Sequence, residues 1–253
     1  MSILETFDAS GEEIIRPEQL VSKPDGFPEV LVTGFSRSVT DLAAQLPGAV
    51  QIDTLRAGME LPIIAVRRSG KTIGVYQSLI GGAASAGLLE EVLAKGAKKV
   101  LFYGSCGALD RDLTAGRVMV PTAAFRDEGT SYHYLSASDG DFVDIPTAGR
   151  LGELLDEIGV PYLYGKTWTT DAIYRETRTN AARRLKQGCL TVEMECASVM
   201  AAAQFRGAEV YQFLYAADSL SGSRWDPRIL GRLPAEEKER YLRIALEIAQ
   251  RLA

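Results

Sequence analysis

The stretch IGGAASAGLLEEVLAKGAKKVLFYGSCG, residues 80–107, decides the fold. Its first half has small and apolar residues at helical spacing after two glycines, and it predicts a helix over 83–95 that ends at Gly96. The second half, 98–104, is typical of a strand buried on both faces, and it ends in another glycine turn. A helix followed directly by such a strand is the repeating unit of proteins in which helices cover both faces of a sheet.

The same alternation continues on both sides of this stretch. Short apolar runs predict strands over 29–34, 49–52, 61–67, 71–78, 116–125, 162–169 and 209–216, with Gly70 and Lys71 at a hairpin between two of them. Apolar residues at helical spacing predict helices over 36–46, 147–158, 175–187, 196–206 and 235–252. We therefore predict an α/β fold: a single domain with a mixed, mostly parallel central sheet flanked by helices on both faces.

The first residues of the chain differ from the rest. Residues 1–28 mix charged side chains with Pro17, Pro24 and Pro28 and show no sustained periodicity. We expect an extended N-terminal arm over 1–28 that packs on the body or on a partner subunit, followed by one catalytic domain over 29–253.

Composition excludes several classes of protein. The 253 residues include 28 Lys and Arg against 33 Asp and Glu, a net charge of −5, so no extended basic field is available for general nucleic-acid binding. No apolar run has the length of a membrane span, and the acidic start lacks the basic segment of a signal peptide, so a cytoplasmic protein is expected. Three cysteines and one histidine, without paired CxxC motifs, predict no metal site.

Ligands of such sheets bind beyond the carboxyl ends of the strands, so the turns after the strands are the places to search. Gly34-Phe35-Ser36-Arg37 offers backbone N–H groups, a hydroxyl and a guanidinium at the start of a predicted helix, as a phosphate site requires. The same turn could equally be an ordinary helix cap with a surface arginine. Gly104-Ser105-Cys106-Gly107 allows close backbone approach to a ligand, although a tight structural turn explains it as well.

Acidic residues stand next to apolar stretches at two further places. Glu193 and Glu195 precede an apolar stretch, and a carboxylate that points into such surroundings needs a hydrogen-bonding partner, such as a pair of sugar hydroxyls. Alternatively, both acids lie in the first turn of a helix, where the helix dipole favours negative charge. Asp218 follows the apolar run 209–216, where burial would raise its pKa and suit it to proton donation; the alternative is a helix cap.

Taken in order, these segments resemble the nucleoside phosphorylase family, which includes uridine phosphorylase, hexameric purine nucleoside phosphorylase and the methylthioadenosine nucleosidases. The resemblance runs from about Glu29 to Arg251. Its most specific motifs are Ile80-Gly81-Gly82, Gly104-Ser105-Cys106-Gly107-Ala108-Leu109, Ala115-Gly116-Arg117-Val118, Thr170-Asp171-Ala172-Ile173-Tyr174, Val192-Glu193-Met194-Glu195 and Asp218-Ser219.

The resemblance implies a pentosyltransferase that cleaves the N-glycosidic bond of a purine or uridine ribonucleoside. Inorganic phosphate would be the co-substrate, the products would be free base and ribose 1-phosphate, and no cofactor would be needed. The sites of this family are shared between subunits, which implies a homo-oligomer, either a dimer or a hexamer. No nucleic-acid or membrane partner is implied.

The motifs also imply a role for individual residues. Glu195, with Met194 and Glu193, would bind ribose, and Asp218 matches the acid that protonates purine N7. The base pocket would be lined by Cys106, Gly107, Ile173, Tyr174 and Arg178, and phosphate would be held by Gly34, Arg37, Ser105 and, from a neighbouring subunit, Arg56.

Three departures from the family pattern keep alternatives open. Phe102 stands where a phosphate-binding arginine is expected, the turn before Arg37 is one residue shorter, and the Gln-x-Arg pair that reads uracil is half matched by Glu176-Thr177-Arg178. A nucleosidase that uses water is one alternative, although 34–40 lacks the glutamate that would activate it. A nucleoside-binding protein without turnover is the other, because fold alone does not fix function.

Overall fold

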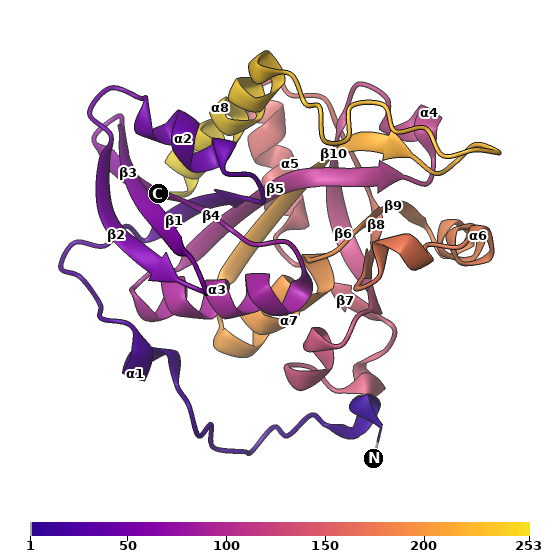
Figure 1. The fold of residues 1–253 in the computed structure, drawn as a ribbon, viewed down its shortest axis with the longest axis horizontal. Coiled ribbons are helices and arrows are strands. Elements are labelled where there is room, and N and C mark those ends of the chain that lie inside the picture. Colours follow the sequence, from indigo (N-terminus) through magenta and orange to yellow (C-terminus); the bar gives the residue numbers. More distant parts are fainter. Residues whose placement is uncertain (1) are drawn as a thin grey trace.

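The computed structural model describes residues 2–253, and its centre is one mixed sheet (Figure 1). The strands are β1 (Val30–Gly34), β2 (Val50–Arg56), β3 (Glu60–Arg68), β4 (Lys71–Gln77), β5 (Lys99–Ala108), β6 (Val118–Asp127), β7 (Phe142–Asp144), β8 (Tyr162–Thr170), β9 (Cys189–Glu193) and β10 (Glu209–Ser219). The helices are α1 (Pro17–Leu20), α2 (Ser38–Ala44), α3 (Gly82–Ala94), α4 (Arg111–Thr114), α5 (Ala148–Glu157), α6 (Arg178–Lys186), α7 (Cys196–Arg206) and α8 (Ala235–Leu252).

The sheet has an open half and a closed half. The strand order is β10-β6-β8-β9-β5-β1-β4-β3-β2, and β10 also pairs with β5, so β5, β10, β6, β8 and β9 form a closed ring. The long pairings β5–β10 and β6–β8 are parallel, whereas β2, β3 and β4 form an antiparallel meander at the open edge. The predicted α/β architecture is confirmed, and the ring is a feature that the alternation of elements did not predict.

The turn between β3 and β4 shows why these residues form a hairpin. Ser69 and Gly70 have φ of 48° and 78°, the positive values at both central positions that define a tight two-residue hairpin turn. The backbone twist of this turn matches the right-handed twist of β3 and β4, in which Arg68 and Lys71 are the pair next to the turn. The hairpin predicted at Gly70 and Lys71 is therefore confirmed.

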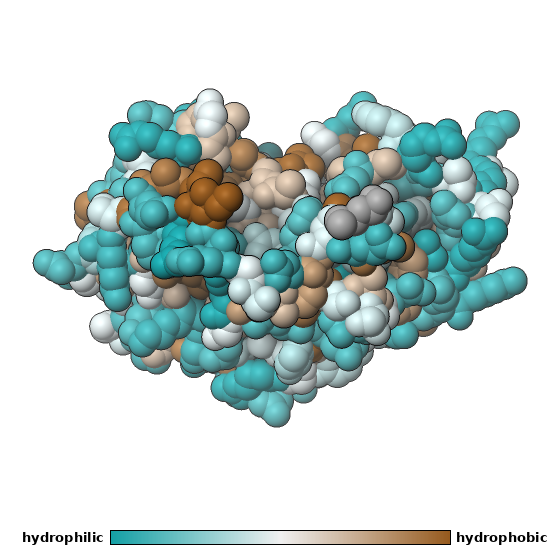
Figure 2. Space-filling view, turned by 90° about the horizontal axis from the view of Figure 1, so that it is seen from below, coloured by the Kyte–Doolittle hydropathy of each residue, from teal (hydrophilic) through white to brown (hydrophobic). Residues whose placement is uncertain are grey.

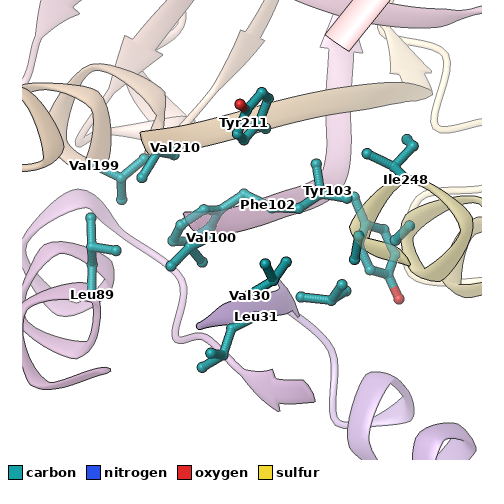
Figure 3. Close-up of a cluster of buried hydrophobic side chains, with 14 of the residues drawn as sticks. Val30, Leu31, Leu89, Val100, Phe102, Tyr103, Val199, Val210, Tyr211 and Ile248 are labelled. Carbon is teal, nitrogen blue, oxygen red and sulfur yellow. The ribbon is translucent and has the colours of Figure 1, made fainter. Parts of the chain in front are cut away.

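Helices cover both faces of the sheet and enclose the core. Leu89 of α3 and Val199 of α7 approach the strands β5 and β10 from one side, and Ile248 of α8 packs from the other (Figure 3). Phe102, in the middle of β5, is completely buried between these layers. Burial of so many large apolar side chains, at roughly 25 cal/mol per Å², is the main stabilising contribution.

The N-terminal segment runs along the outside of the body (Figure 1). It contains the short helix α1, and Glu13 makes an ion pair of 2.8 Å with Arg206 at the end of α7. The face shown in Figure 2 is mostly polar, with apolar side chains in small separate groups. Within residues 2–253, no helix is both long and apolar enough to cross a membrane.

Candidate functional site

A cavity of about 650 Å³ opens where β5, β9 and β10 meet. Gly107 of β5 pairs with Val192 of β9 on one side and with Asp218 of β10 on the other, so the ends of three strands converge on one point. A shift of register between Ala216 and Asp218 lies here, and such bulges re-aim side chains next to active sites. Residues far apart in the sequence therefore line one pocket.

Two acidic residues enter this pocket from the turn between β9 and α7. Glu193 accepts short hydrogen bonds from Thr169 Oγ1 at 2.6 Å, the backbone N–H of Glu195 at 2.7 Å and that of Cys196 at 2.6 Å, and a longer one from Thr167 Oγ1 at 3.5 Å. Glu193 therefore fixes the start of α7. Glu195 is 5% exposed, and its Oε1 accepts from the backbone N–H of Gly81 at 2.7 Å.

Gly81 explains the glycine pair that precedes α3. Its φ of 101° is a conformation that residues with a side chain rarely adopt, and this turn aims its N–H at Glu195. Burial raises the pKa of both Glu193 and Glu195, and the negative charge of Glu193 raises that of Glu195 further. A carboxylate has about four acceptor positions, so Glu195 can still bind a pair of ligand hydroxyls.

Asp218, at the carboxyl end of β10, is 7% exposed. Burial raises its pKa, and a hydrogen bond from Trp225 partly opposes this effect. The indole Nε1–H of Trp225 donates to Asp218 Oδ2 at 2.6 Å. An acid whose neutral form is favoured by burial can donate a proton to a leaving group.

A third acidic side chain, Glu176, also lines the cavity, just before α6. Burial and the negative charge of Asp218 raise the pKa of Glu176 to about 7. Two residues later, Arg178 donates to the carbonyl oxygens of Gly222, at 2.9 Å, and of Ser223. Arg178 thereby fixes the loop that carries Trp225.

The family model of the phosphorylase superfamily matches residues 29–252. The chain belongs to this superfamily. The resemblance to nucleoside phosphorylases that the sequence motifs indicate is thereby confirmed.

Two relatives and one solved structure show how far this likeness extends. A guanosine phosphorylase of Halorubrum lacusprofundi is 30% identical over 155 residues, which cover 58% of this chain and 61% of that protein. A uridine phosphorylase of Thermococcus kodakarensis is 34% identical over 105 residues, which cover 42% of this chain and 38% of that protein. The chain thus spans less than two thirds of either relative.

The structural likeness is more extensive. A purine nucleoside phosphorylase from Toxoplasma gondii, solved in complex with immucillin-H, superposes with a TM-score of 0.75. The alignment covers 96% of this chain and 98% of that chain at 22% identity, so the two share a fold.

The structure brings most of the residues expected at the site of a superfamily member into one pocket. They are Ser105, Cys106, Gly107, Ile173, Tyr174, Arg178, Glu193, Met194, Glu195 and Asp218. Trp225 is an additional lining residue that the sequence analysis did not name, and Glu176, which stands there in the half-matched base-reading pair, also lines the cavity. A tryptophan in the polar loop 220–234 was the available signal for the first of them.

The other residues expected to bind phosphate are not among the lining residues of this cavity, although Phe35 of the same turn is. Arg37 is 85% exposed and pairs with Asp41 at 3.6 Å, whereas Arg56 is 77% exposed and pairs with Glu60 at 3.9 Å. Gly34 is the last residue of β1 and is buried. Within residues 2–253, no cluster of three or more His, Cys, Asp or Glu could hold a metal ion.

An aromatic side chain occupies the space beside Ser105. A Cβ atom at Gly104 would lie 2.7 Å from Phe35 Cδ2, which shows that the Phe35 ring rests directly on this glycine. Phe35 also packs against Phe102, with ring centroids 6.2 Å apart. The position where the family pattern has an arginine is therefore part of the buried apolar core.

Proposed function

We propose that the chain is a pentosyltransferase that cleaves the N-glycosidic bond of a ribonucleoside with phosphate, releasing the base and ribose 1-phosphate. The observation that carries this proposal is that Glu195, at the start of α7, and Asp218, at the end of β10, are buried carboxyl groups that line the same cavity. Membership of the phosphorylase superfamily supports the reaction type. The names of the relatives, guanosine and uridine phosphorylase, support a nucleoside as the substrate.

The chemistry follows from the two carboxyl groups. Glu195 accepts hydrogen bonds from the ribose 2′ and 3′ hydroxyls, which favour its carboxylate form against the effect of burial, and the carboxylate stabilises the positive charge that develops on the sugar. As the bond from C1′ to nitrogen breaks, its electron pair passes to the base, and neutral Asp218 donates a proton to N7 of a purine. A phosphate oxygen then forms the new bond to C1′, and Asp218 regains its proton from solvent.

Phosphate binding is proposed for Ser105, which lines the cavity, together with Gly34 and Arg37 of the neighbouring turn. Arg56 would approach from a second copy of the chain, so we propose a homo-oligomer. We place this oligomer in the cytoplasm.

Water is the second candidate for the attacking group. The apolar contact between Phe35 and Phe102, at the position expected for a phosphate-binding arginine, favours it. The proton transfer from Asp218 and the sugar contacts of Glu195 would be the same in both reactions.

The test is base release from a panel of purine and pyrimidine nucleosides, each with and without phosphate. Chromatography must separate ribose from ribose 1-phosphate. Ribose 1-phosphate formed only with phosphate would confirm the proposal, whereas free ribose at a rate independent of phosphate would establish the reaction with water. Binding without any product would refute both.

A further inference from the structure

Two helices that begin at the proposed ribose site, α3 and α7, lie side by side on one face of the sheet (Figure 1). Gly81, directly before α3, donates its N–H to the carboxylate of Glu195, directly before α7. Glu193 and Thr169 bond to backbone N–H groups at the start of α7, but within residues 2–253 none of their hydrogen bonds reaches α3. The spacing between the two helix starts, which determines where Glu195 lies, therefore needs another contact to hold it.

Glu128, directly after β6, is the side chain that joins the two helix starts. It is 7% exposed, and its Oε2 accepts from Ser198 Oγ, in the first turn of α7, at 2.6 Å. The same oxygen accepts from the backbone N–H of Ser131 at 2.9 Å. Ser198 in turn rests on Gly82, the first residue of α3, where a Cβ atom would lie 2.1 Å from Ser198 Oγ. One carboxylate oxygen thus ties the turn after β6 to the starts of both helices.

A second buried glutamate joins the same elements at the other ends of the helices. Glu90 of α3 is 8% exposed and accepts from Arg206 Nε, at the end of α7, at 2.6 Å. It also accepts from the hydroxyl of Tyr134, in the segment after β6, at 2.7 Å. Glu90 lies about 12 Å along α3 from Gly82, so it holds the two helices together far from Glu195. A general effect of helix packing can therefore be separated from an effect on the helix starts.

We propose that Glu128 is a positioning residue, which through Ser198 sets the spacing of α3 and α7 at which Glu195 meets the ribose hydroxyls. This inference rests on the proposed function, since it takes Glu195 as the ribose-binding group. Within the described chain, Glu128 is not among the residues that line the cavity, so it acts without touching the nucleoside. Hydrogen bonds weaken steeply away from their ideal distance and angle, so a small shift of Glu195 weakens its contacts with the sugar.

The test compares the affinities of a ribonucleoside and its 2′-deoxy analogue. The ligands are 9-deazaguanosine and 2′-deoxy-9-deazaguanosine, whose carbon to carbon glycosidic bond is not cleaved, and calorimetry gives the affinities. Both carry the same base, so the contacts of the base cancel in the ratio. We expect the wild-type protein to bind 9-deazaguanosine about 10-fold or more tightly, because its 2′ hydroxyl donates to the charged Glu195.

The variants remove the contact of Glu128 in two ways and restore it in a third. In Glu128→Ala and in Ser198→Ala the preference for the ribonucleoside should fall to within about threefold. In Glu128→Gln the preference should remain, because one amide oxygen can accept both hydrogen bonds that Oε2 accepts. If Glu128→Ala does not fold, as judged by circular dichroism, Ser198→Ala decides.

The matched control is Glu90→Ala, which removes an equally buried glutamate from the same pair of helices and should keep the full preference. A preference unchanged in Glu128→Ala and Ser198→Ala would overturn the inference. Loss of the preference in Glu128→Gln would also overturn it, since the hydrogen bonds would then not be the cause. Loss in Glu90→Ala would overturn it as well, because general packing of the helices would then explain the result.

The proposed function fails in a different way. A wild-type protein that binds both ligands equally, or neither of them, would remove the ribose role of Glu195 and this inference with it. A protein that shows the expected changes in preference but releases no base from guanosine would retain the inference about Glu128 and lose the reaction.

Discussion

Replacing Trp225 by phenylalanine removes one hydrogen bond from the proposed proton donor and keeps an aromatic ring in the cavity wall. The indole N–H lies 2.6 Å from Asp218 Oδ2 and can only donate, so it stabilises the charged carboxylate. For the same reason it places the proton of neutral Asp218 on Oδ1, the oxygen beside Gly107. We predict that the variant changes both the pKa of Asp218 and the position of its proton.

The magnitude follows from the type of bond and its exposure. A hydrogen bond to a charged group contributes about 1.5–3 kcal/mol. Trp225 is 58% exposed, so we take the lower end of this range, about 1.5 kcal/mol, which corresponds to about one pKa unit. Burial already raises the pKa of Asp218, and loss of a donor that favours the anion raises it further.

The assay is the pH dependence of kcat. Catalysis needs neutral Asp218, so activity falls as pH rises through its pKa, and this limb should move about one unit toward higher pH in Trp225→Phe. The maximal rate should also fall, because the proton can then reside on Oδ2. In an Asp218→Asn background the same substitution should have no effect on the profile. If the fall in kcat at high pH occurs at the same pH as in the wild-type protein while the maximal kcat is lower, then Trp225 acts only on the shape of the loop. That result would refute the reasoning.

Three further predictions concern binding and stability. Glu195→Gln should weaken ribonucleoside binding about 10-fold or more by calorimetry, since a charged acceptor is lost; unchanged affinity would remove its ribose role. Gly82→Ala should destabilise the protein by about 1–3 kcal/mol in denaturant unfolding, because the new Cβ would lie 2.1 Å from Ser198 Oγ; an unaltered midpoint would contradict this. Burial alone would raise the pKa of Asp53, but hydrogen bonds from Lys95 Nζ, at 2.6 Å, and a backbone N–H lower it. The stability from this pair should therefore be present above about pH 4 and lost as pH falls through the lowered pKa. In Lys95→Met, the temperature of thermal unfolding should therefore depend less steeply on pH in this acid range.

Local patterns predicted most elements of the fold, but not the closure of the sheet. The glycine turns and apolar runs around β1, β4 and β5 are strong signals over short windows. β9 escaped prediction because it has only five residues, among which Thr191 and Glu193 are polar and yet buried. The ring through β6, β8 and β9 depends on register between distant strands, which no local pattern contains.

The residues of the candidate site divide in the same way, into those that local sequence predicts and those that only the tertiary structure brings to the cavity. Glu195 and Asp218 lie at or just beyond the carboxyl ends of β9 and β10, where sequence reasoning searches for ligand-binding groups. Trp225 reaches Asp218 only because its loop folds back over the pocket, and Arg178 holds that loop through carbonyl groups 44 and 45 residues away. Such contacts depend on tertiary structure rather than on spacing.

The helix α7 begins at Cys196, immediately after Glu195, and its alanines allow close packing against its neighbours. Ala201, Ala202 and Ala203 are buried, and Ser198 on the same helix touches Gly82 of α3. A heavier side chain at any of these alanines would push the helix along its axis or away from the sheet, and Glu195 would travel with it. If Glu195 binds ribose as proposed, affinity for the sugar can thus change through mutations that never contact a ligand, on a helix about 16 Å long.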